Sequence, residues 1–306
     1  MDIVDFYPLY PCLRFITMNI APTIVITGAT SGIGQIAAVE LARQGANVIL
    51  TARNEAKAAA TRAAIKAVAP GARIDVHYAD FTSLDAVAKV GAEIAKTCER
   101  IDVLINNAGL HAFEQRITAD GFSEMVAVNY LAPWLLTHIL REKLLGSVPS
   151  RVVTVASEAS RRSGGLQPRR DICSTSAFTR LGSSKLYGRT KLMNIMFSLE
   201  LARQLQGTEV AVNCLDPGFN VTGLGRELGF AATLERVLKA LNIGNPQRGA
   251  GIIVRLATEP VFGRESGGYF SVNDARRLVP VTPGNDVGAQ QELWSVTSEL
   301  LAVRWI

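Results

Sequence analysis

Thr27-Gly28-Ala29-Thr30-Ser31-Gly32-Ile33-Gly34 is the stretch of sequence that decides the fold. An apolar segment, Thr23 to Ile26, precedes it, and apolar residues recur at helical spacing after it, from Ile33 to Leu41. Glycine permits a tight turn and lets a phosphate approach the backbone. A helix that begins here offers N–H groups and a positive dipole end. The stretch predicts a dinucleotide-binding loop; the alternative is a tight turn with a close helix–strand contact and no ligand.

The composition is typical of a globular protein. The chain has 306 residues, 48% of them hydrophobic, and no apolar run long enough to span a bilayer. Four widely separated cysteines form no CxxC pair, and three histidines show no metal-ligand spacing. We therefore expect one soluble domain without a disulfide framework or metal, in the reducing cytoplasm.

Positive charge is concentrated in one segment. The formal net charge is +5, and residues 161–180 hold five arginines against one aspartate. A nucleic-acid interface needs a basic face built from several elements. A solvated basic loop is the favoured interpretation, and we expect no nucleic-acid partner.

The first 17 residues lack the positive start and uninterrupted apolar core of a signal peptide. Met18, just before the first strand, is a candidate natural start. We expect residues 1–17 to be an extension and residues 18–306 to form the domain; whether the extension packs on the surface stays open.

Strand and helix signals alternate along the chain. Strands are expected at 23–27, 47–51, 73–78, 101–106, 151–156, 209–215 and 268–271. Helices are expected at 33–44, 54–69, 83–98, 118–144, 185–206 and 246–258. Repeated β-α-β units imply a parallel sheet with right-handed crossovers. The predicted fold is α/β: a Rossmann, doubly wound, mainly parallel seven-stranded sheet with helices on both faces, in a single domain.

Two segments interrupt this alternation. Residues 158–184 are rich in Arg, Ser, Gly and Thr. Residues 223–245 carry leucines around a polar face, which predicts one or two short amphipathic helices. This second segment is expected to be a lid on an apolar pocket; an oligomer contact or a membrane-surface patch are the alternatives.

Four motifs in order carry a family resemblance. They are the glycine stretch as TGxxxGxG, Asn106-Asn107-Ala108-Gly109, Ser157, and Tyr187-Gly188-Arg189-Thr190-Lys191 as YxxxK. From about residue 22 to the C-terminus the chain resembles the short-chain dehydrogenase/reductase family. The long Ser157–Tyr187 spacing, Gly267-Gly268-Tyr269-Phe270 and Leu293-Trp294 resemble its retinol-dehydrogenase-like and protochlorophyllide-reductase-like branch. The arginines at 161–170 do not match that branch.

Tyr187 and Lys191 lie four residues apart on a predicted helix and so share a face. A lysine cation nearby favours the phenolate and is expected to lower the pKa of the tyrosine toward the working range. The resemblance implies that Tyr187 exchanges a proton with the substrate oxygen and that Lys191 holds the nicotinamide ribose. The alternative is a surface Tyr–Lys pair.

Ser157 ends a predicted strand, where a hydroxyl can donate to a developing oxyanion; the alternative is a turn or N-cap serine. Asn129 precedes Pro133 by four residues, and the proline removes the hydrogen bond to its carbonyl and tends to kink the helix. The resemblance implies that Asn129 anchors a water in a proton relay from Lys191. A kink-stabilising asparagine is the compatible alternative.

The end of the second predicted strand selects the cofactor. An NAD-preferring fold carries an acidic residue there, whereas this chain has Ala52 followed by Arg53. A guanidinium suits a 2′-phosphate, so NADP(H) is predicted; a solvated loop arginine is the alternative.

The resemblance implies further cofactor contacts. Asp80 is expected at the adenine amino group, Asn107 to Gly109 along the adenosine, and Pro217-Gly218 with Thr222 near the nicotinamide. The whole predicted cofactor set is Gly28, Ser31, Gly32, Ile33, Gly34, Arg53, Asp80, Phe81, Asn107, Ala108, Gly109, Tyr187, Lys191, Pro217, Gly218 and Thr222.

His111 and Phe219 are expected to border the substrate mouth. The predicted reaction is hydride transfer between NADP(H) and a medium-to-large apolar ketone, aldehyde or secondary alcohol, in the reductive direction, with Tyr187 as general acid/base. Two alternatives stay open: a C=C reductase on the same scaffold, and a non-catalytic NADP(H)-binding regulator. The resemblance also implies a homodimer or homotetramer that pairs the helices carrying Asn129 and Tyr187.

Overall fold

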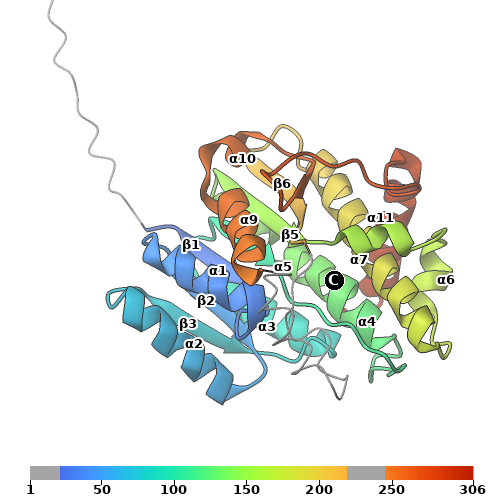
Figure 1. The fold of residues 1–306 in the computed structure, drawn as a ribbon, viewed down its shortest axis with the longest axis horizontal. Coiled ribbons are helices and arrows are strands. Elements are labelled where there is room, and N and C mark those ends of the chain that lie inside the picture. Colours follow the sequence, from blue (N-terminus) through green and yellow to red (C-terminus); the bar gives the residue numbers. More distant parts are fainter. Residues whose placement is uncertain (1–20, 219–244, 306) are drawn as a thin grey trace, which may run out of the picture.

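Seven parallel strands form one sheet in the order β3-β2-β1-β4-β5-β6-β7 (Figure 1). The structure, a computed structural model, describes residues 21–218 and 245–305. The extension 1–17, Phe219, Thr222 and all but the last residue of the predicted lid lie outside the described residues. The strands are β1 (Thr23–Ile26), β2 (Asn47–Ala52), β3 (Ile74–Tyr78), β4 (Val103–Asn106), β5 (Ser150–Val155), β6 (Val210–Asp216) and β7 (Gly268–Ser271).

The strand order reverses beside β1. The chain runs outward from β1 through β2 to β3, then returns to place β4 against the other side of β1. All six strand pairs are parallel, so their carboxyl ends meet at one edge of the sheet. Ligands bind such sheets at the point of reversal. This confirms the predicted doubly wound fold and places the glycine stretch there.

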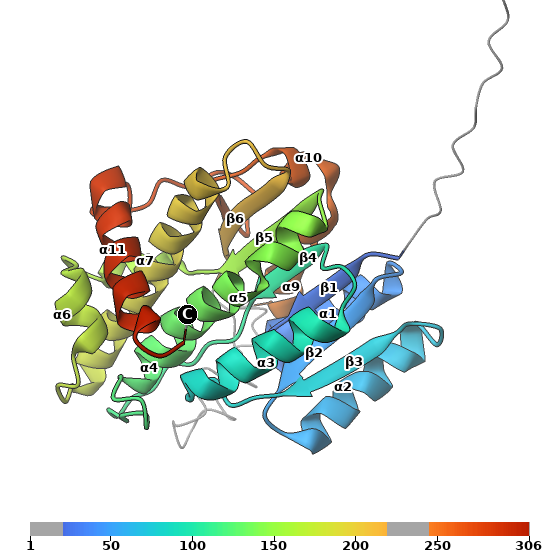
Figure 2. The ribbon, with the colours of Figure 1, turned by 180° about the vertical axis from the view of Figure 1, so that it is seen from behind.

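Helices cover both faces of the sheet (Figures 1 and 2). One face carries α1, α2 and α9, and the other carries α3, α5 and α7, with α6 and α11 outside α7. Their bounds are α1 (Gly32–Arg43), α2 (Glu55–Val68), α3 (Leu84–Thr97), α5 (Ala132–Gly146), α6 (Pro168–Cys173), α7 (Arg180–Gln204), α9 (Pro246–Thr258), α10 (Pro260–Arg264) and α11 (Val287–Ala302).

Apolar side chains fill two core layers because successive residues of a strand point to opposite faces. Val25 packs in the layer under α3, α5 and α7, whereas Ile24 and Ile26 pack in the layer under α1 and α9. The strands are buried on both sides, as their continuous apolar runs predict.

The helix predicted over 118–144 is not continuous. Ile117 and Ser123 form an isolated antiparallel bridge, α4 (Glu124–Val126) follows, and a π-helical turn, η1 (Ala127–Leu131), precedes α5. Pro133 explains the break because it has no N–H to continue the α-helical ladder. A π-helical turn inside a helix commonly marks a functional site.

The arginine-rich segment contains more regular secondary structure than the loop that the sequence predicts. It contains a 3-10 turn, η2 (Glu158–Arg162), then α6 and the first turn of α7. Asp171, which is 2% exposed, accepts from the guanidinium groups of Arg170 and Arg189. Arg169 pairs with Glu299 of α11. Arg169 of the segment, and Arg189 of α7 through Asp171, therefore tie the insertion to the rest of the domain.

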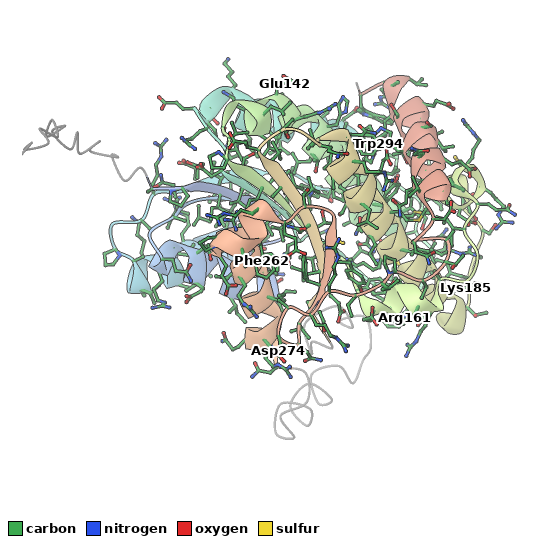
Figure 3. The ribbon with its side chains drawn as sticks, turned by 90° about the horizontal axis from the view of Figure 1, so that it is seen from above. Glu142, Arg161, Lys185, Phe262, Asp274 and Trp294 are labelled. Atoms are coloured by element: carbon green, nitrogen blue, oxygen red, sulfur yellow. The ribbon has the colours of Figure 1, made fainter. Side chains whose placement is uncertain are left out.

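The C-terminal helix α11 packs over α7 and α5. The Trp294 ring lies between the rings of Phe197 on α7 and Trp134 on α5, at centroid distances of 5.9 and 5.1 Å (Figure 3). The hydroxyls of Tyr130 and Thr297 lie 2.6 Å apart.

Between residues 21 and 218 and between 245 and 305, no helix is both long and apolar enough to cross a bilayer.

Candidate active site

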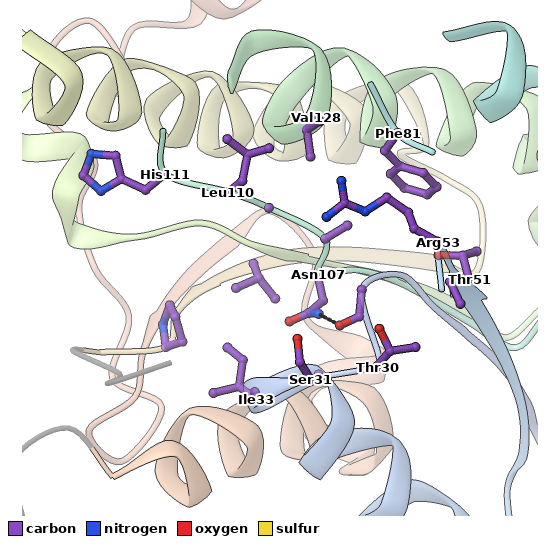
Figure 4. A pocket seen from close by; sticks show the side chains of 18 of the residues that line it. Thr30, Ser31, Ile33, Thr51, Arg53, Phe81, Asn107, Leu110, His111 and Val128 are labelled. Atoms are coloured by element: carbon purple, nitrogen blue, oxygen red, sulfur yellow. Dashed lines mark hydrogen bonds between the residues drawn. The ribbon is translucent and has the colours of Figure 1, made fainter. Parts of the chain in front are cut away.

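A cavity of about 460 Å³ opens at the carboxyl ends of the central strands (Figure 4). The predicted residues that line it are Gly28, Ser31, Gly32, Ile33, Gly34, Arg53, Asp80, Phe81, Asn107, Ala108, Gly109, His111, Ser157, Tyr187, Lys191, Pro217 and Gly218. Of the predicted site residues within the described part of the chain, only Asn129 lies outside the lining.

The glycine stretch and the loop after β4 are in close contact. Gly28 has a φ of +66°, and a Cβ there would lie 2.8 Å from Ala108 Cα. A Cβ on Gly34 would lie 2.3 Å from Asn107 Nδ2. Asn107 Nδ2 donates to the Gly28 carbonyl at 3.2 Å and to the Thr27 carbonyl at 2.8 Å. Asn107 thus fastens the glycine turn to the loop after β4, and the close contact leaves no room for a side chain at Gly28 or Gly34.

The N-terminus of α1 faces the same cavity. Ser31 is the N-cap, but its side chain forms no capping hydrogen bond. The first N–H groups of a helix lack intrahelical partners and attract anions. Ser31 and Gly32 to Gly34 therefore form a cradle that fits the pyrophosphate of a dinucleotide.

Two basic side chains line the far end of the cavity. Arg53 follows β2 and lies 3.8 Å from Asp80 in an exposed ion pair. Lys57 in the first turn of α2 lines the cavity as well, and its backbone N–H donates to the N-cap Asn54 at 2.9 Å. Sequence reasoning missed Lys57; the signal was a basic residue one helical turn past Arg53 and Asn54. Together these groups can hold a phosphate.

Ser157 stands just after β5 and lines the cavity together with Tyr187 and Lys191. It is the N-cap of η2, and its Oγ accepts from the Ala159 N–H at 3.1 Å. The O–H remains able to donate toward the cavity. Both interpretations of Ser157 therefore hold: it caps a turn and it lines the site.

Tyr187 and Lys191 share one face of α7, as their spacing predicts. Lys191 is 4% exposed, its Nζ donates to the Val155 carbonyl at 2.8 Å, and it lies 5.7 Å from the centre of the Tyr187 ring. Burial lowers the pKa of Lys191 to about 8. The pair lines the cavity with Ser157, which excludes the alternative of a surface pair.

The expected lowering of the tyrosine pKa is wrong for this structure. Burial raises the pKa of the Tyr187 phenol, and the nearby Asp216 carboxylate raises it further. The cost of burying a phenolate outweighs the attraction of a lysine whose own charge is weakened by burial. Burial therefore disfavours the phenolate of Tyr187 in this structure.

Asn129 lies in the π-helical turn η1 and is fully buried. Its Oδ1 accepts from the Leu110 N–H at 2.8 Å, and its Nδ2 donates to the Leu110 carbonyl at 2.9 Å. Nδ2 also donates to Thr190 Oγ1, which donates to the Tyr187 carbonyl. Asn129 therefore joins the loop after β4 to the catalytic helix, and its part in a proton relay stays a prediction.

The comparisons with known proteins agree with this geometry. A family model described as short chain dehydrogenase matches residues 22–168. Retinol dehydrogenase 13 of Homo sapiens is 33% identical over 287 residues, covering 92% of this chain and 85% of that protein. The chain belongs to the short-chain dehydrogenase/reductase family. It falls in the retinol-dehydrogenase-like branch, as retinol dehydrogenase 14 of Mus musculus, 35% identical over 294 residues, also indicates.

Other members of the family extend this likeness. The "Putative daunorubicin C-13 ketoreductase DnrU" of Streptomyces sp. (strain C5) is 35% identical and covers 90% of this chain and 91% of its own. The crystal structure of an uncharacterized protein from Mycobacterium Paratuberculosis superposes with a TM-score of 0.70 at 27% identity, covering 93% and 95% of the two chains. Membership of the short-chain dehydrogenase/reductase family makes the chain an oxidoreductase that uses a nicotinamide cofactor.

His111 adds an aromatic ring to the cavity lining beside Tyr187. Its ring stacks on Tyr187 with centroids 4.7 Å apart and lies 4.6 Å from the Phe113 ring. Its Nε2 lies 3.3 Å from Ser183 Oγ. The side chains of Leu110 and Val128 also line the cavity (Figure 4).

Proposed function

We propose that this protein is an NADP(H)-dependent oxidoreductase that reduces a medium-to-large apolar ketone or aldehyde to the alcohol. The observation that carries the proposal is one cavity with two chemically distinct ends. A phosphate cradle with two basic side chains forms one end, and Ser157, Tyr187 and Lys191 form the other.

Each residue at the second end has a separate role in the proposed reaction. A bound nicotinamide cofactor supplies the hydride for the carbonyl carbon. Ser157 donates a hydrogen bond to the carbonyl oxygen, where negative charge develops. Tyr187, which lines the same end of the cavity as Ser157, then gives that oxygen its proton. Lys191, buried one turn along α7, orients the cofactor ribose and keeps a positive charge near the tyrosine.

The choice of NADP(H) rests on the basic end of the cavity. Ala52 stands where a carboxylate would select NAD, and a 2′-phosphate would be repelled by a carboxylate. Arg53 and Lys57 supply two positive charges instead, beside the N-terminus of α2. Both favour a phosphorylated ribose.

The choice of an apolar substrate rests on apolar and aromatic side chains in the cavity lining. Leu110, Val128 and His111 line the cavity, and the His111 ring is backed by the ring of Phe113. His111 is proposed as a substrate contact. The relative whose name describes a C-13 ketoreductase supports a bulky ketone as the first substrate class to test.

The family implies a homodimer or homotetramer, which we propose here, and the packing of α11 restricts which surfaces can form its interface. Trp134 on α5 and Phe197 on α7 already contact Trp294 of α11. Any pairing of the helices that carry Asn129 and Tyr187 must use the surface that α11 leaves open.

A substrate panel tests the proposed function. Purified protein is incubated with NADPH and a series of aliphatic, aromatic and polycyclic ketones and aldehydes, with enones of matched size in parallel, and NADPH absorbance is followed. We expect oxidation of NADPH by bulky ketones with alcohol as the product. Saturated ketone formed from an enone would instead favour C=C reduction. Tight NADPH binding without turnover of any compound would contradict the proposal and favour a regulator.

A further inference from the structure

The side chains that carry the proposed proton transfer are held in two different ways. The turn that contains Ser157 is fixed by Asp216 of β6, whose Oδ1 accepts from the Glu158 N–H at 3.0 Å. Lys191 is fixed by its hydrogen bond to a backbone carbonyl of β5. The ring of Tyr187 is instead stacked on an imidazole from the loop after β4.

His111 supplies this imidazole and contacts α7 at two points. Its ring and the Tyr187 ring are inclined by 20° with centroids 4.7 Å apart, which is the geometry of stacked rings. Its Nε2 lies 3.3 Å from the Oγ of Ser183, which is fully buried. Ser183 and Tyr187 are four residues apart on α7 and so lie on one face of this helix. His111 therefore joins the tyrosine ring to the preceding turn of the same helix.

The backbone next to His111 is fixed as well. Asn129 Oδ1 accepts from the Leu110 N–H at 2.8 Å, and Asn129 Nδ2 donates to the Leu110 carbonyl at 2.9 Å. The same Nδ2 donates to Thr190 Oγ1 of α7. A Cβ on Gly109 would lie 3.3 Å from Asn129 Oδ1, so the loop passes close to this side chain. The loop after β4 is thus fastened to α7 directly before His111.

The orientation of the Tyr187 ring matters for the proposed chemistry. A proton donor must come within about 2.6–3.2 Å of the oxygen that receives the proton. A tyrosine ring turns about two bonds, and the second of these has a broad torsional preference. Misplacement of a reacting group by about 1 Å can lower a rate by roughly a hundredfold. A ring stacked on the tyrosine restricts these movements.

We infer that His111 is a positioning residue that, together with Ser183, holds the Tyr187 ring in the orientation for proton transfer. The inference rests on the proposed function, because it concerns the residue that gives up the proton there. It goes beyond the substrate contact proposed above. A positioning residue acts on kcat for every substrate, whereas a substrate contact acts on KM and differs between ketones.

Substitutions at the two contact points test the inference. His111→Ala removes the ring and should lower kcat by about tenfold, by the same factor for small and bulky ketones, with KM nearly unchanged. His111→Phe keeps a ring that can stack, so it should recover most of this loss. Ser183→Ala removes only the hydrogen bond and should lower kcat by about threefold. A change confined to KM, or a His111→Phe protein as slow as His111→Ala, would overturn the inference.

His138→Ala is the matched control. The His138 ring also stacks on an aromatic ring, that of Trp134, with centroids 5.2 Å apart, but both residues belong to α5 and neither lines the cavity. This substitution removes a stacked histidine elsewhere and should leave kcat unchanged. Equal losses of kcat in His138→Ala and His111→Ala would overturn the inference, because the effect would then be a general loss of packing.

A measurement without substrate separates this inference from the proposed function. The full chain is produced with isotope-labelled tyrosine, and the ring signal missing from Tyr187→Phe is assigned to Tyr187 by nuclear magnetic resonance. We expect the Tyr187 ring to rotate faster in His111→Ala than in the unsubstituted protein, in His111→Phe and in His138→Ala. Equal rotation rates in all four proteins would overturn the inference. If the unsubstituted protein reduces no ketone or aldehyde, the proposed function fails, and the rotation rates still decide whether His111 holds the ring.

Discussion

The glycine end of the cavity and its catalytic end place their functional groups in different ways. At the glycine end, each group sits in a short turn directly after its strand, as Gly28 follows β1 and Arg53 follows β2. At the catalytic end, Ser157, Tyr187 and Asp216 come from β5, α7 and β6 and are held by contacts between residues far apart in sequence. Short turns after the strands place the groups of the first end, where Asn107 holds the glycine turn from 79 residues away. The second end brings together groups from three separate elements through buried polar contacts.

The comparison predicts that substitutions can impair one end without the other, and a large effect on kcat is expected at Ser157. Replacing it with alanine removes a donor to the developing oxyanion and should lower kcat by roughly a hundred- to a thousandfold. NADPH affinity, measured by fluorescence titration, should not change. Ser160→Ala, in the same turn and also buried, is the control. Equal losses of kcat in the two variants would show that the turn, and not the hydroxyl, matters.

Substitution of Leu293 tests whether the packing of α11 against α7 stabilises the fold around the catalytic end. This side chain is 1% exposed in the core against α7, and Leu293→Ala should lower the free energy of unfolding by about 3 kcal/mol. Glu292→Ala, its exposed neighbour, should change it little. Urea unfolding measures both. Weaker binding of NADPH by the folded Leu293→Ala protein would contradict the claim that the glycine end binds the cofactor independently of the catalytic end.

The buried Lys191 should make the free energy of unfolding depend on pH. The pKa of Lys191 is about 8 in the folded protein, against an ordinary value of 10.5. Between these values the unfolded chain binds more protons than the folded one, so the free energy of unfolding rises with pH. The gain from about pH 8 to about pH 10 should be ~2 kcal/mol larger than in Lys191→Met. Urea unfolding at both pH values with identical pH slopes would contradict the buried, weakly basic lysine.

The smallest expected effect lies at the basic end of the cavity. Arg53 is exposed, and Arg53→Ala should raise the KM for NADPH by about tenfold because one charged hydrogen bond to the 2′-phosphate is lost. The KM for NADH should stay the same. Lys57→Ala should also raise the KM for NADPH. Arg73 is another exposed arginine with an aspartate partner, and Arg73→Ala should leave this KM unchanged. Equal effects on NADPH and NADH would refute the assignment of NADP(H).

The sequence predicts the glycine end more completely than the catalytic end for a physical reason. A glycine turn, a strand end and an i, i+4 pair are local patterns, and all seven strands were expected close to their observed positions. The Tyr187–Lys191 face and the strand-end position of Ser157 could be predicted for the same reason.

Other features depend on tertiary burial and could not be read from local pattern. The pKa of Tyr187 rises because of burial and Asp216, neither of which its own helix reveals. The helix α11 was missed because its apolar residues match neighbours on α5 and α7 rather than a clear amphipathic period. The ion pair of Arg169 with Glu299 joins residues 130 positions apart, so the local pattern of α6 could not predict it.

The turnover of Tyr187→Phe tests the central claim, that one cavity binds the cofactor at one end and moves a proton at the other. Kinetics with the best ketone of the panel should show kcat lower by about two to four orders of magnitude, the range of general acid catalysis. The dissociation constant for NADPH should stay nearly the same, because the phosphate cradle lies elsewhere. Normal turnover in this variant, or loss of NADPH binding together with turnover, would contradict the division of the cavity into these two ends.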